Sequence, residues 1–556
     1  MILVFPPVAK PSEPPAGIAK LVGALNHHGI PSRVLDANIE GLLFLMDNSR
    51  RLSDAPSGRW TTRALRSLST NLAALRDRNT YRNIDRYARA VMDLNRVLEI
   101  STVGKNVTIG LANYGDERLS PLRSSDLIRA AENPEVNPFY PYFEGRLLKL
   151  LEEEQPSAVG FSLNYLSQAL CTFAMAGFLR RHCPGLTLVL GGGLVTSWVK
   201  NQDWQEPYRT DPFVGLIDHL VAGPGEDRLL SIMKSLHARR PAQPRSGRKL
   251  MHEISSARCE IVSERRTGHN TRPDATKGLT SGGSRPDYNS LPLHDYLAPG
   301  FVLPYSGASG CSWKRCSFCP ERAEDNPYFP LPAARVAADL TSLAEESRPV
   351  LLHLLDNAVS TAVMKSLSLN PPGIPWYGFA RIGPQLAEMD FCLDLKRSGC
   401  VMLKLGLESG DQGVLDSMEK GIDLVTASRV LKTLKKAGIA SYVYLLFGTP
   451  PEAEAEAGET LDFTVRHSNE IGFLNLALFN MPLRGPYASR FETSRFYEGD
   501  LSLYADFSHP KGWNRRRVRR FLEREFKKHP AVAPILIKDP PLFTSNHAPF
   551  FTGGYG

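Results

Sequence analysis

Three cysteines lie within nine residues of one another, in the segment Gly307-Ala-Ser-Gly-Cys311-Ser-Trp-Lys-Arg-Cys316-Ser-Phe-Cys319-Pro320. Thiolates are the usual protein ligands of iron-sulfur clusters. Three of them on one short loop can bind three corners of a 4Fe-4S cubane, and the preceding glycines let the backbone pass close to it. The fourth iron would then have no protein ligand. We therefore expect Cys311, Cys316 and Cys319 to hold a cluster whose fourth iron can bind a small molecule.

The spacing Cys-x4-Cys-x2-Cys leaves other kinds of site open. It also occurs in plant-type 2Fe-2S ferredoxins, which need a fourth cysteine, and the next one along this chain is Cys392. A zinc site would need a fourth Cys or His at ordinary spacing, and three structural thiols without a metal are the remaining interpretation. Five further cysteines stand singly in apolar or helical stretches, so we expect them to be structural. They are Cys171, Cys183, Cys259, Cys392 and Cys400.

Composition indicates an ordinary folded protein of more than one domain. The chain has 556 residues, of which 42% are hydrophobic and 22% charged, enough for two or three separate cores. Eight cysteines are too few for a disulfide scaffold, which favours a reducing compartment and predicts a cytoplasmic protein. The first residues read as a strand rather than a signal peptide, and the absence of a long apolar run predicts no membrane span.

The net charge of +8 comes largely from two basic stretches, 239–285 and 515–528. In the second, apolar residues recur at helical spacing and predict a basic amphipathic helix. Aromatic stacking or recognition motifs do not accompany the basic residues, so we interpret them as a solvated face rather than a nucleic-acid site. The apolar residues are Val518, Phe521, Leu522 and Phe526.

Strand-like runs alternate with helical segments over the first 235 residues. This alternation predicts a parallel, doubly wound, Rossmann-like sheet. An insertion over about 46–142 interrupts it, and its periodicity predicts helices. The expected strands are 2–5, 32–36, 158–163, 186–190 and 219–222.

A stretch rich in Arg, Ser, Gly and Pro, 236–293, reads as a linker, with a short strand pair near 251–262. A second alternation of strands and helices over 294–482 fits a partial (β/α)6 TIM-like barrel. We expect functional loops at the carboxyl ends of its strands, and a C-terminal cap over 483–556. The expected strands are 301–306, 350–355, 376–381, 401–407, 440–447 and 474–479.

The segment Gly406-Leu-Glu408-Ser-Gly410, together with the cysteine loop, resembles the cobalamin-binding radical S-adenosylmethionine (radical SAM) enzymes, the class B methyltransferases among them. The first gap between the cysteines is one residue longer than in the usual signature of that superfamily. The resemblance implies a 4Fe-4S cluster whose open iron chelates S-adenosylmethionine. It also implies that Glu408 contacts the adenosyl cofactor. Met402, Lys404, Gly406 and Glu408 alternate along a strand and are therefore expected on one face.

Four other segments match cofactor-binding positions of that superfamily. Phe318 is the aromatic residue before the last cluster cysteine, and Gly448 lies in the turn expected near the adenine. Asp356 and Asn357 replace the usual glycine- and Glu-containing motif at the end of the second barrel strand. Arg381, at the end of the third, could hold the cofactor carboxylate or pair with an acid.

The first 235 residues resemble the cobalamin-binding domain of the same enzymes. Glycines and small polar residues follow the predicted strands, at the edge where such sheets bind ligands. The segment Asp36-Ala-Asn38-Ile-Glu-Gly41 has Asn where a lower axial histidine would stand, so we expect cobalamin without a His ligand; a sheet that binds no cobalamin is the alternative. The candidate residues are Pro7, Ser162, Gly191, Gly192, Gly193, Gly223, Gly225 and Glu226.

The resemblance implies methylation of an unactivated carbon through a 5′-deoxyadenosyl radical and methylcobalamin. A non-methylating oxidation, cyclisation or rearrangement with the same cofactors is an alternative, and a non-catalytic iron-sulfur electron-transfer protein is another. We expect a small-molecule or peptide substrate and an external electron donor such as flavodoxin or ferredoxin. Candidate substrate determinants in the cap are Arg484, Tyr487, Asn546 and His547.

Overall fold

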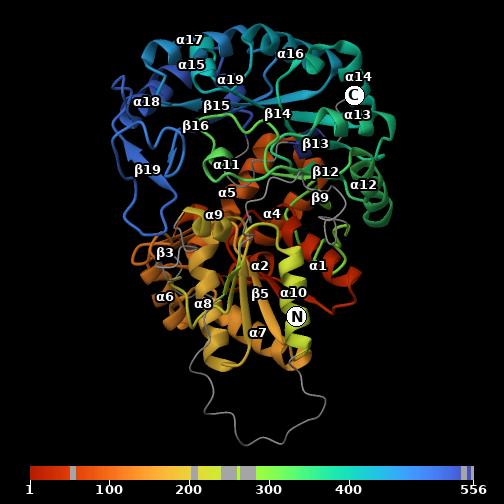
Figure 1. Ribbon diagram of the computed structural model, residues 1–556, viewed down its shortest axis with the longest axis vertical. Helices are drawn as coiled ribbons and strands as arrows, with labels where there is room; N and C mark the ends of the chain where they lie inside the picture. Colours follow the sequence, from red (N-terminus) through yellow and green to blue (C-terminus); the bar gives the residue numbers. More distant parts are fainter. Residues whose placement is uncertain (50–57, 202–210, 239–259, 263–283, 540–547, 552–556) are drawn as a thin grey trace, which may run out of the picture. The chain divides into compact units, whose positions relative to one another are not determined.

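The computed structural model describes residues 1–49, 58–201, 211–238, 260–262, 284–539 and 548–551 (Figure 1). The chain divides into two compact units, and each contains a six-stranded parallel sheet. This confirms the α/β class with parallel sheets. The first unit comprises Met1–Ala73, Ala90–Leu297 and Glu498–Ser502, and the second comprises Ala74–Arg89, Ala298–Tyr497 and Leu503–Gly556.

The first sheet has the order β2-β1-β5-β6-β7-β8, with all neighbours parallel. Its first five strands in chain order are those that the sequence predicts. The sixth, β8, lies at the end of the expected strand pair and joins β7 in parallel; residues 251–259, the rest of that pair, lie outside the described chain. The strands are β1 (Ile2–Phe5), β2 (Arg33–Asp36), β5 (Ala158–Ser162), β6 (Thr187–Gly191), β7 (His219–Val221) and β8 (Glu260–Val262).

The direction in which successive strands are added to this sheet reverses once, at β1. From β1 it passes to β2 on one side, and after a long excursion it returns to β5 on the other side. The carboxyl ends of β1 and β5 therefore flank a topological switch point, where open α/β sheets bind ligands. Pro6 and Leu163 are the first residues beyond these two strands.

The excursion between β2 and β5 is mostly helical. It also holds an antiparallel pair, β3 (Val107–Ile109) with β4 (Tyr114–Asp116), which the sequence did not predict. Only Val107 and Ile109 of β3 are buried, a pattern too short to distinguish from a turn of helix. The helices between β2 and β5 are α2 (Ala37–Asn48), α3 (Arg59–Arg66), α4 (Leu68–Arg76), α5 (Ile84–Ser101), α6 (Ser124–Glu132) and α7 (Tyr140–Glu154).

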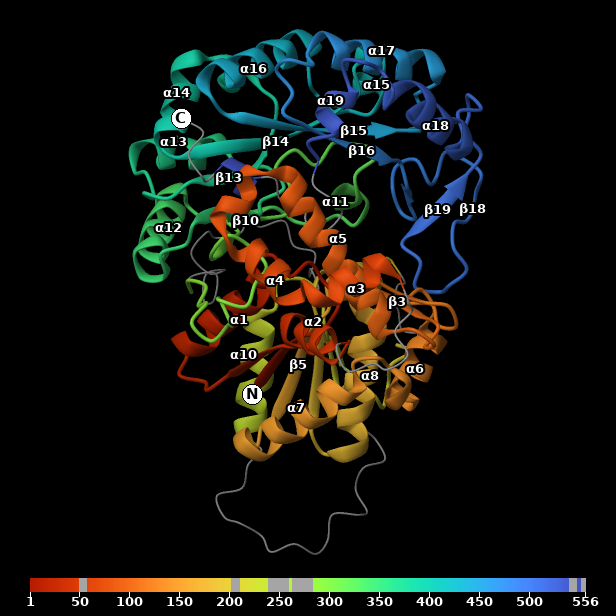
Figure 2. The ribbon, with the colours of Figure 1, turned by 180° about the vertical axis from the view of Figure 1, so that it is seen from behind.

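The second sheet follows chain order, β9-β12-β13-β14-β15-β16, and all its pairs are parallel. Each of the six strands lies where the sequence predicts one. Helices α14 (Met389–Arg397), α16 (Leu424–Ala437) and α17 (Glu454–Arg466) lie along one side of it in both views (Figures 1 and 2). The strands are β9 (Val302–Tyr305), β12 (Leu351–Leu354), β13 (Trp376–Ala380), β14 (Cys400–Glu408), β15 (Ala440–Phe447) and β16 (Phe473–Leu478).

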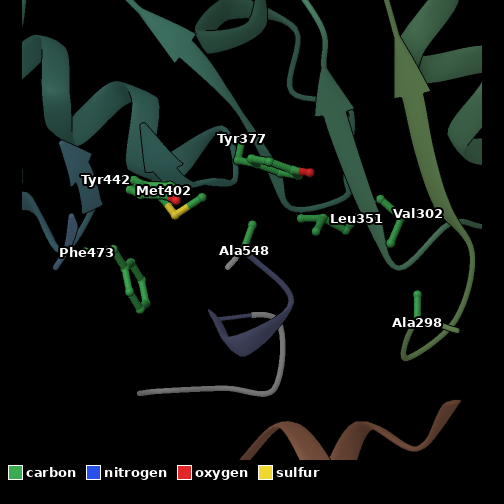
Figure 3. Packing of buried hydrophobic residues seen from close by; sticks show 8 residues of the cluster. All are labelled: Ala298, Val302, Leu351, Tyr377, Met402, Tyr442, Phe473 and Ala548. Atoms are coloured by element: carbon green, nitrogen blue, oxygen red, sulfur yellow. The ribbon is translucent and has the colours of Figure 1, made fainter. Parts of the chain in front are cut away.

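A layer of buried side chains lines the other face of the second sheet (Figure 3). Each of the six strands contributes one residue, and Ala548 of η6 (Ala548–Phe551) packs against them. Phe550 of the same turn packs on Tyr81 and Tyr87 at ring distances of 5.3 and 5.2 Å. The strand residues of the layer are Val302, Leu351, Tyr377, Met402, Tyr442 and Phe473.

The basic segment after residue 514 is helical, as predicted. It forms α18 (Arg515–Phe521), which continues as the π-helix η5 (Leu522–Phe526). The four predicted apolar residues are at most 5% exposed, while Arg516, Arg519 and Arg520 face solvent. Among the described residues, none of the helices combines the length and apolar character that a membrane span requires.

A glycine sets how closely two helices of the first unit approach. Gly177 lies in α8 (Leu166–His182), and a Cβ there would stand 1.9 Å from the carbonyl oxygen of Ala131 in α6. We expect Gly177→Ala to lower the free energy of unfolding by about 1–3 kcal/mol, because backbone must move. The matched control is Gly145→Ala at an exposed position of α7, where a Cβ meets nothing within 4 Å and should stabilise the fold by about 0.5–1 kcal/mol. Urea unfolding of both variants tests this, and equal effects would contradict it.

Candidate functional site

The cysteine loop is closed at its base by a short pair of strands. It follows β9, and β10 (Ala308–Ser309) pairs antiparallel with β11 (Phe329–Pro330), so residues 310–328 form a closed loop. At its first position, Gly310 has φ +73°, and a Cβ there would stand 2.2 Å from the carbonyl oxygen of Pro327. Both features favour glycine and draw the two ends of the loop together.

The segment between the second and third cysteines is anchored on both sides. The N–H of Ser317 donates to the carbonyl of Met418 at 3.0 Å, and its hydroxyl bonds the Tyr487 hydroxyl at 2.7 Å. Ser317 and Tyr487 are 3% and 5% exposed. Tyr487, considered above as a substrate determinant, therefore supports the cysteine loop.

The three thiols are half-buried and close enough to interact. Cys316 interacts electrostatically with Cys311 and with Cys319. Burial raises the pKa of the Cys316 thiol and raises that of Cys319 to about 11, so a bound metal must displace protons. Within the described chain, Cys, His, Asp and Glu side chains do not converge in threes on a single-ion site. A cubane binds each thiolate through a different iron, and this donor set suits it better than it suits zinc.

Asp356, just after β12, holds the start of the loop. It is 4% exposed, and its Oδ1 accepts the N–H groups of Gly307 at 2.7 Å and Ala308 at 3.0 Å. Burial raises its pKa to about 6. The neighbouring Asn357 is exposed at the same strand end. Asp356 thus lies beside the start of the cysteine loop, and its Oδ1 is bonded to the loop's backbone.

Glu408 ends β14 in an unusual conformation. Its φ is +71°, and the pairing of β14 with β15 shifts register between Gly406 and Glu408. The side chain folds back over Gly406, where a Cβ would stand 2.6 Å from Glu408 Oε1. That oxygen accepts from Lys420 Nζ at 2.8 Å, and Nζ lies 5.5 Å from the centre of the Phe318 ring. An ion pair that is 12–14% exposed therefore joins the strand end to the cysteine loop.

Arg381 follows β13 and also reaches the cysteine loop. Its guanidinium lies 3.8 Å from the centre of the Trp313 ring and donates to the carbonyls of Lys420 and Gly421. It also interacts electrostatically with Cys316 and Cys311. Of the predicted cofactor-binding residues, Phe318, Asp356, Glu408 and Arg381 are thus gathered around the cysteines.

Gly448 begins the turn after β15 with φ +82°. Its N–H donates to the carboxylate of Glu452, which also accepts from Trp513 Nε1 at 3.0 Å. Glu452 is fully buried, and its second oxygen has no hydrogen-bond partner within the described structure. Burial raises its pKa to about 8, so this carboxyl holds a proton at neutral pH.

In the first unit, hydrogen-bonding side chains tie the strand ends together. Gln168 donates to the Pro6 carbonyl at 2.7 Å and accepts the N–H of Asn164 at 3.0 Å. Asn164 bonds the hydroxyl of Ser162 at 3.0 Å and accepts the N–H of Gly193 at 2.9 Å. The ends of β1, β5 and β6 are therefore linked, with Pro7 and Ser162 at the switch point.

Thr196 extends this network to β7. It accepts the N–H of Gly223 and donates to the carbonyl of Gly192, both at 2.9 Å. Gly192 has φ +114°, and a Cβ there would stand 2.3 Å from Leu163, so the β6 turn requires glycine. Gly191 closes β6, and Gly223 lies at the same edge.

Gly225 and Glu226 pack against α1 (Ala16–His27) instead. A Cβ at Gly225 would lie 3.3 Å from Leu21, and Glu226 forms a 2.7 Å ion pair with Lys20. Glu226 is 6% exposed. These two residues hold the start of α10 (Glu226–Ala238) on α1, apart from the hydrogen-bonded strand ends.

Sequence reasoning missed several residues of both sites. Lys420 lies ten residues after the segment Gly406–Gly410, and Trp313 lies within the cysteine loop, yet neither position indicates its partner. Asn546, His547 and Cys259 lie outside the described residues, and Arg484 is exposed. The other missed residues are Asn164, Gln168, Thr196 and Glu452.

None of the family models matches the sequence of this chain, but solved structures share its fold. The solved structure of the radical S-adenosylmethionine methyltransferase TsrM from Kitasatospora setae, with cobalamin and a 4Fe-4S cluster bound, covers 97% of this chain and 89% of TsrM, at 16% identity and a TM-score of 0.52. A second TsrM structure, with tryptophan substrate and a SAM analogue, gives 15% identity, the same coverage and a TM-score of 0.53.

An uncharacterized methyltransferase of Pyrococcus horikoshii is 26% identical to this chain over 186 residues. The match spans 32% of this chain and 40% of that relative. The chain therefore shares its fold, two parallel sheets of which one has a three-cysteine loop at its first strand end, with TsrM, in agreement with the resemblance found in the sequence.

The buried Glu452 carboxyl predicts a pH dependence of stability. Its folded-state pKa of about 8 lies above the ordinary 4.5, so the folded protein keeps a proton that the unfolded chain releases. The stabilisation is complete below pH 4.5 and is lost as pH rises through 8. We expect Glu452→Gln to remove this loss, giving the variant an advantage on the order of a few kcal/mol at pH 9 that shrinks toward pH 5.

Glu456→Gln is the matched control, because Glu456 is partly exposed and pairs with Lys511 at 2.9 Å. Urea unfolding at several pH values measures the effect, and Glu456→Gln should follow the wild-type pH profile from pH 5 to 9. Parallel profiles for wild type and Glu452→Gln would contradict the assignment of a raised pKa to Glu452.

Proposed function

We propose that the protein is a cobalamin-dependent radical SAM enzyme that methylates an unactivated carbon of its substrate. The observation that carries this proposal is the closed loop of three half-buried thiols, with Glu408, Asp356 and Arg381 gathered beside it. The fold shared with TsrM supports it. TsrM has been solved with a small-molecule substrate, which favours a small molecule here as well, with an external electron donor such as flavodoxin or ferredoxin.

In this proposal each part of the chain has one task. Residues 294–482 form a partial barrel that binds the cluster, 483–556 cap it, 1–235 bind cobalamin and 236–293 connect the two. When bound, the cluster with S-adenosylmethionine supplies a carbon-centred radical and cobalamin supplies the methyl group.

The chain's own residues bind and orient these groups. Cys311, Cys316 and Cys319 would hold the cluster, on a loop fixed by Asp356 and Ser317. Glu408 would face the adenosyl cofactor from the end of β14. In the first unit, glycine-bearing strand ends would let the corrin ring approach the backbone.

The direct test is anaerobic reconstitution with iron, sulfide and hydroxocobalamin, followed by reductant and methyl-labelled S-adenosylmethionine. We expect about four irons and about one corrinoid per chain, with label transferred to the bound corrinoid. Replacing the three loop cysteines by alanine should abolish the cluster absorbance and leave corrinoid binding intact. Cys183→Ala, a half-exposed thiol of the first unit, is the matched control.

Cluster formation without corrinoid binding would contradict the proposed role of the first unit. Corrinoid binding with formation of 5′-deoxyadenosine but without transfer of label would instead favour a non-methylating radical reaction. A cluster that persists in the triple variant would contradict the assignment of the cysteines.

Corrinoid affinity should depend on the hydrogen bonds between strand ends. Thr196→Val keeps the side-chain shape but leaves the N–H of Gly223 without its acceptor, so we expect the Kd for hydroxocobalamin to rise several-fold. Thr172→Val is the matched control, because its buried hydroxyl bonds only the Gln168 carbonyl inside α8. Equilibrium dialysis measures the affinity, and equal Kd values for the two variants would contradict the prediction.

A further inference from the structure

Helix α18 carries a row of exposed arginines on one side, which we call the arginine face. It consists of Arg516, Arg519 and Arg520, all of them exposed, and their spacing of three and four residues places them on the same side of the helix. Val518 and Phe521 are buried on the other side. The arginine face is therefore the solvated side of a helix that its apolar side holds in place.

Electrostatics within the helix do not favour this arrangement. The first turn of α18 consists of Arg515, Arg516 and Arg517. The amino end of a helix carries a partial positive charge, so cations are unfavourable there, and like charges three or four residues apart repel each other. Arg515 is compensated by the carbonyl of Phe479 at 2.9 Å, and Arg517 by Glu454 at 2.8 Å.

The arginine face itself has no such compensation. Among the ion pairs of the described residues, none involves its three side chains. Two acids that contact this helical segment pair with other cations, Glu454 with Arg517 and Glu523 with Lys527. Three guanidinium groups that repel one another, without an ion pair in the described part of the chain, point to a partner that supplies the negative charge.

Side-chain contacts within the second unit connect α18 to the cysteine loop. Ser317 of the loop bonds Tyr487, whose ring lies 6.1 Å from the ring of Phe479. The carbonyl of Phe479 in turn accepts from Arg515, the first residue of α18. Phe318 packs against the same aromatic cluster. The helix that carries the arginine face is thus anchored on side chains that also hold the cysteine loop.

The helix also lies at the strand ends from which the cysteine loop continues. Gly448 follows β15, and a Cβ there would lie 3.3 Å from Val518 of α18. Phe479 follows β16, and the loop follows β9. Because all strands of this sheet are parallel, these three ends lie at its carboxyl edge. In both views α18 lies beside β19 (Tyr504–Phe507), at that edge (Figures 1 and 2).

The small size of the arginine face favours a transient protein partner. Electron-transfer complexes bury less surface than stable complexes, and charge steers their encounter. A nucleic-acid binder whose affinity rests on phosphates makes about six to ten such contacts, more than three guanidinium groups offer. An acidic electron carrier therefore fits this face better than a nucleic acid does.

We propose that the arginine face is the docking site of an acidic electron-carrier protein that reduces the 4Fe-4S cluster. This inference rests on the proposed function, which requires an external electron. One electron passes from the reduced carrier to the cluster, so the carrier is oxidised by one electron and the cluster is reduced by one. The guanidinium groups raise the rate of productive encounter and take no part in the electron transfer itself.

The test measures reduction of the anaerobically reconstituted cluster by flavodoxin hydroquinone, an anion that becomes the neutral semiquinone as it gives up one electron. Stopped-flow absorbance of flavin and cluster gives the second-order rate constant. We expect Arg516→Gln/Arg519→Gln/Arg520→Gln to lower it about tenfold or more at about 50 mM salt. The difference should shrink toward about 0.5 M salt, because salt screens exposed charges. Iron content and reduction by titanium(III) citrate should match wild type.

The matched control removes the same charge from another helix of the same unit. It replaces the three exposed lysines of α16, Lys432, Lys435 and Lys436, by glutamine and should keep the wild-type rate constant. Equal rate constants in the two triple variants would overturn the inference, as would a wild-type rate constant that does not fall with salt. If the arginine variant incorporates less iron, Arg519→Gln alone carries the test: a two- to threefold fall supports the inference and an unchanged rate constant refutes it.

A labelled single-stranded oligonucleotide tests the other anionic partner. Tight binding that the arginine variant loses, with reduction by flavodoxin unchanged, would assign the face to nucleic acid and overturn the inference. A wild-type chain that assembles no cluster, or whose cluster titanium(III) citrate does not reduce, refutes the proposed function itself. A cluster that titanium(III) citrate reduces, with equal flavodoxin rate constants in both triple variants, refutes the docking site alone.

Discussion

The cysteine loop of the second unit depends on one buried carboxylate. Asp356 lies just after β12 and the loop follows β9, and the two strands pair in register, with Leu354 opposite Tyr305. Because parallel strands end at one edge, the carboxylate reaches the N–H groups of Gly307 and Ala308 without a linker. Hydrogen bonds to a charged acceptor contribute about 1.5–3 kcal/mol each, so the loop begins from a fixed point. Farther along the loop, Trp313 and Ser317 add anchors to the turn after Met418 and to Tyr487.

The two units hold the turns and loops at their strand ends with different kinds of side chain. In the first, glycines form the turns at the sheet edge, and the neutral side chains of Gln168, Asn164 and Thr196 hold them. In the second, charged groups are used, including Asp356 and the pair of Glu408 with Lys420. A neutral hydrogen bond can be buried without a compensating charge, whereas a buried charge needs a partner such as Lys420 or several N–H donors.

Strand positions followed from the sequence because buried parallel strands are short apolar runs bounded by turn residues. The cysteine loop, Glu408 and Asp356 could be found because a spacing or a strand end marks them. The residues that contact them could not be found in the same way. Lys420, Tyr487 and Glu452 are separated from their contacts by turns whose path depends on the whole sheet. The bulge at Glu408 was equally hidden, since alternation alone predicts a regular strand there. β8 lies at the end of the strand pair expected near 251–262, but its parallel pairing with β7 could not be predicted, because a three-residue strand in a linker-like segment does not indicate its partner.

The layer that contains Ala548 has a consequence for how the chain is made. The six strands that it covers come from residues 302–478, and the aromatic contacts of Phe550 reach back to Tyr81 and Tyr87. A growing polypeptide on the ribosome can therefore pair all six strands before the residues that shield Tyr442 and Phe473 have been synthesised. Until then the nascent sheet presents an apolar face to solvent, which is the kind of surface that chaperones bind. The second unit thus joins segments from near both ends of the chain, and it completes its core only late in translation.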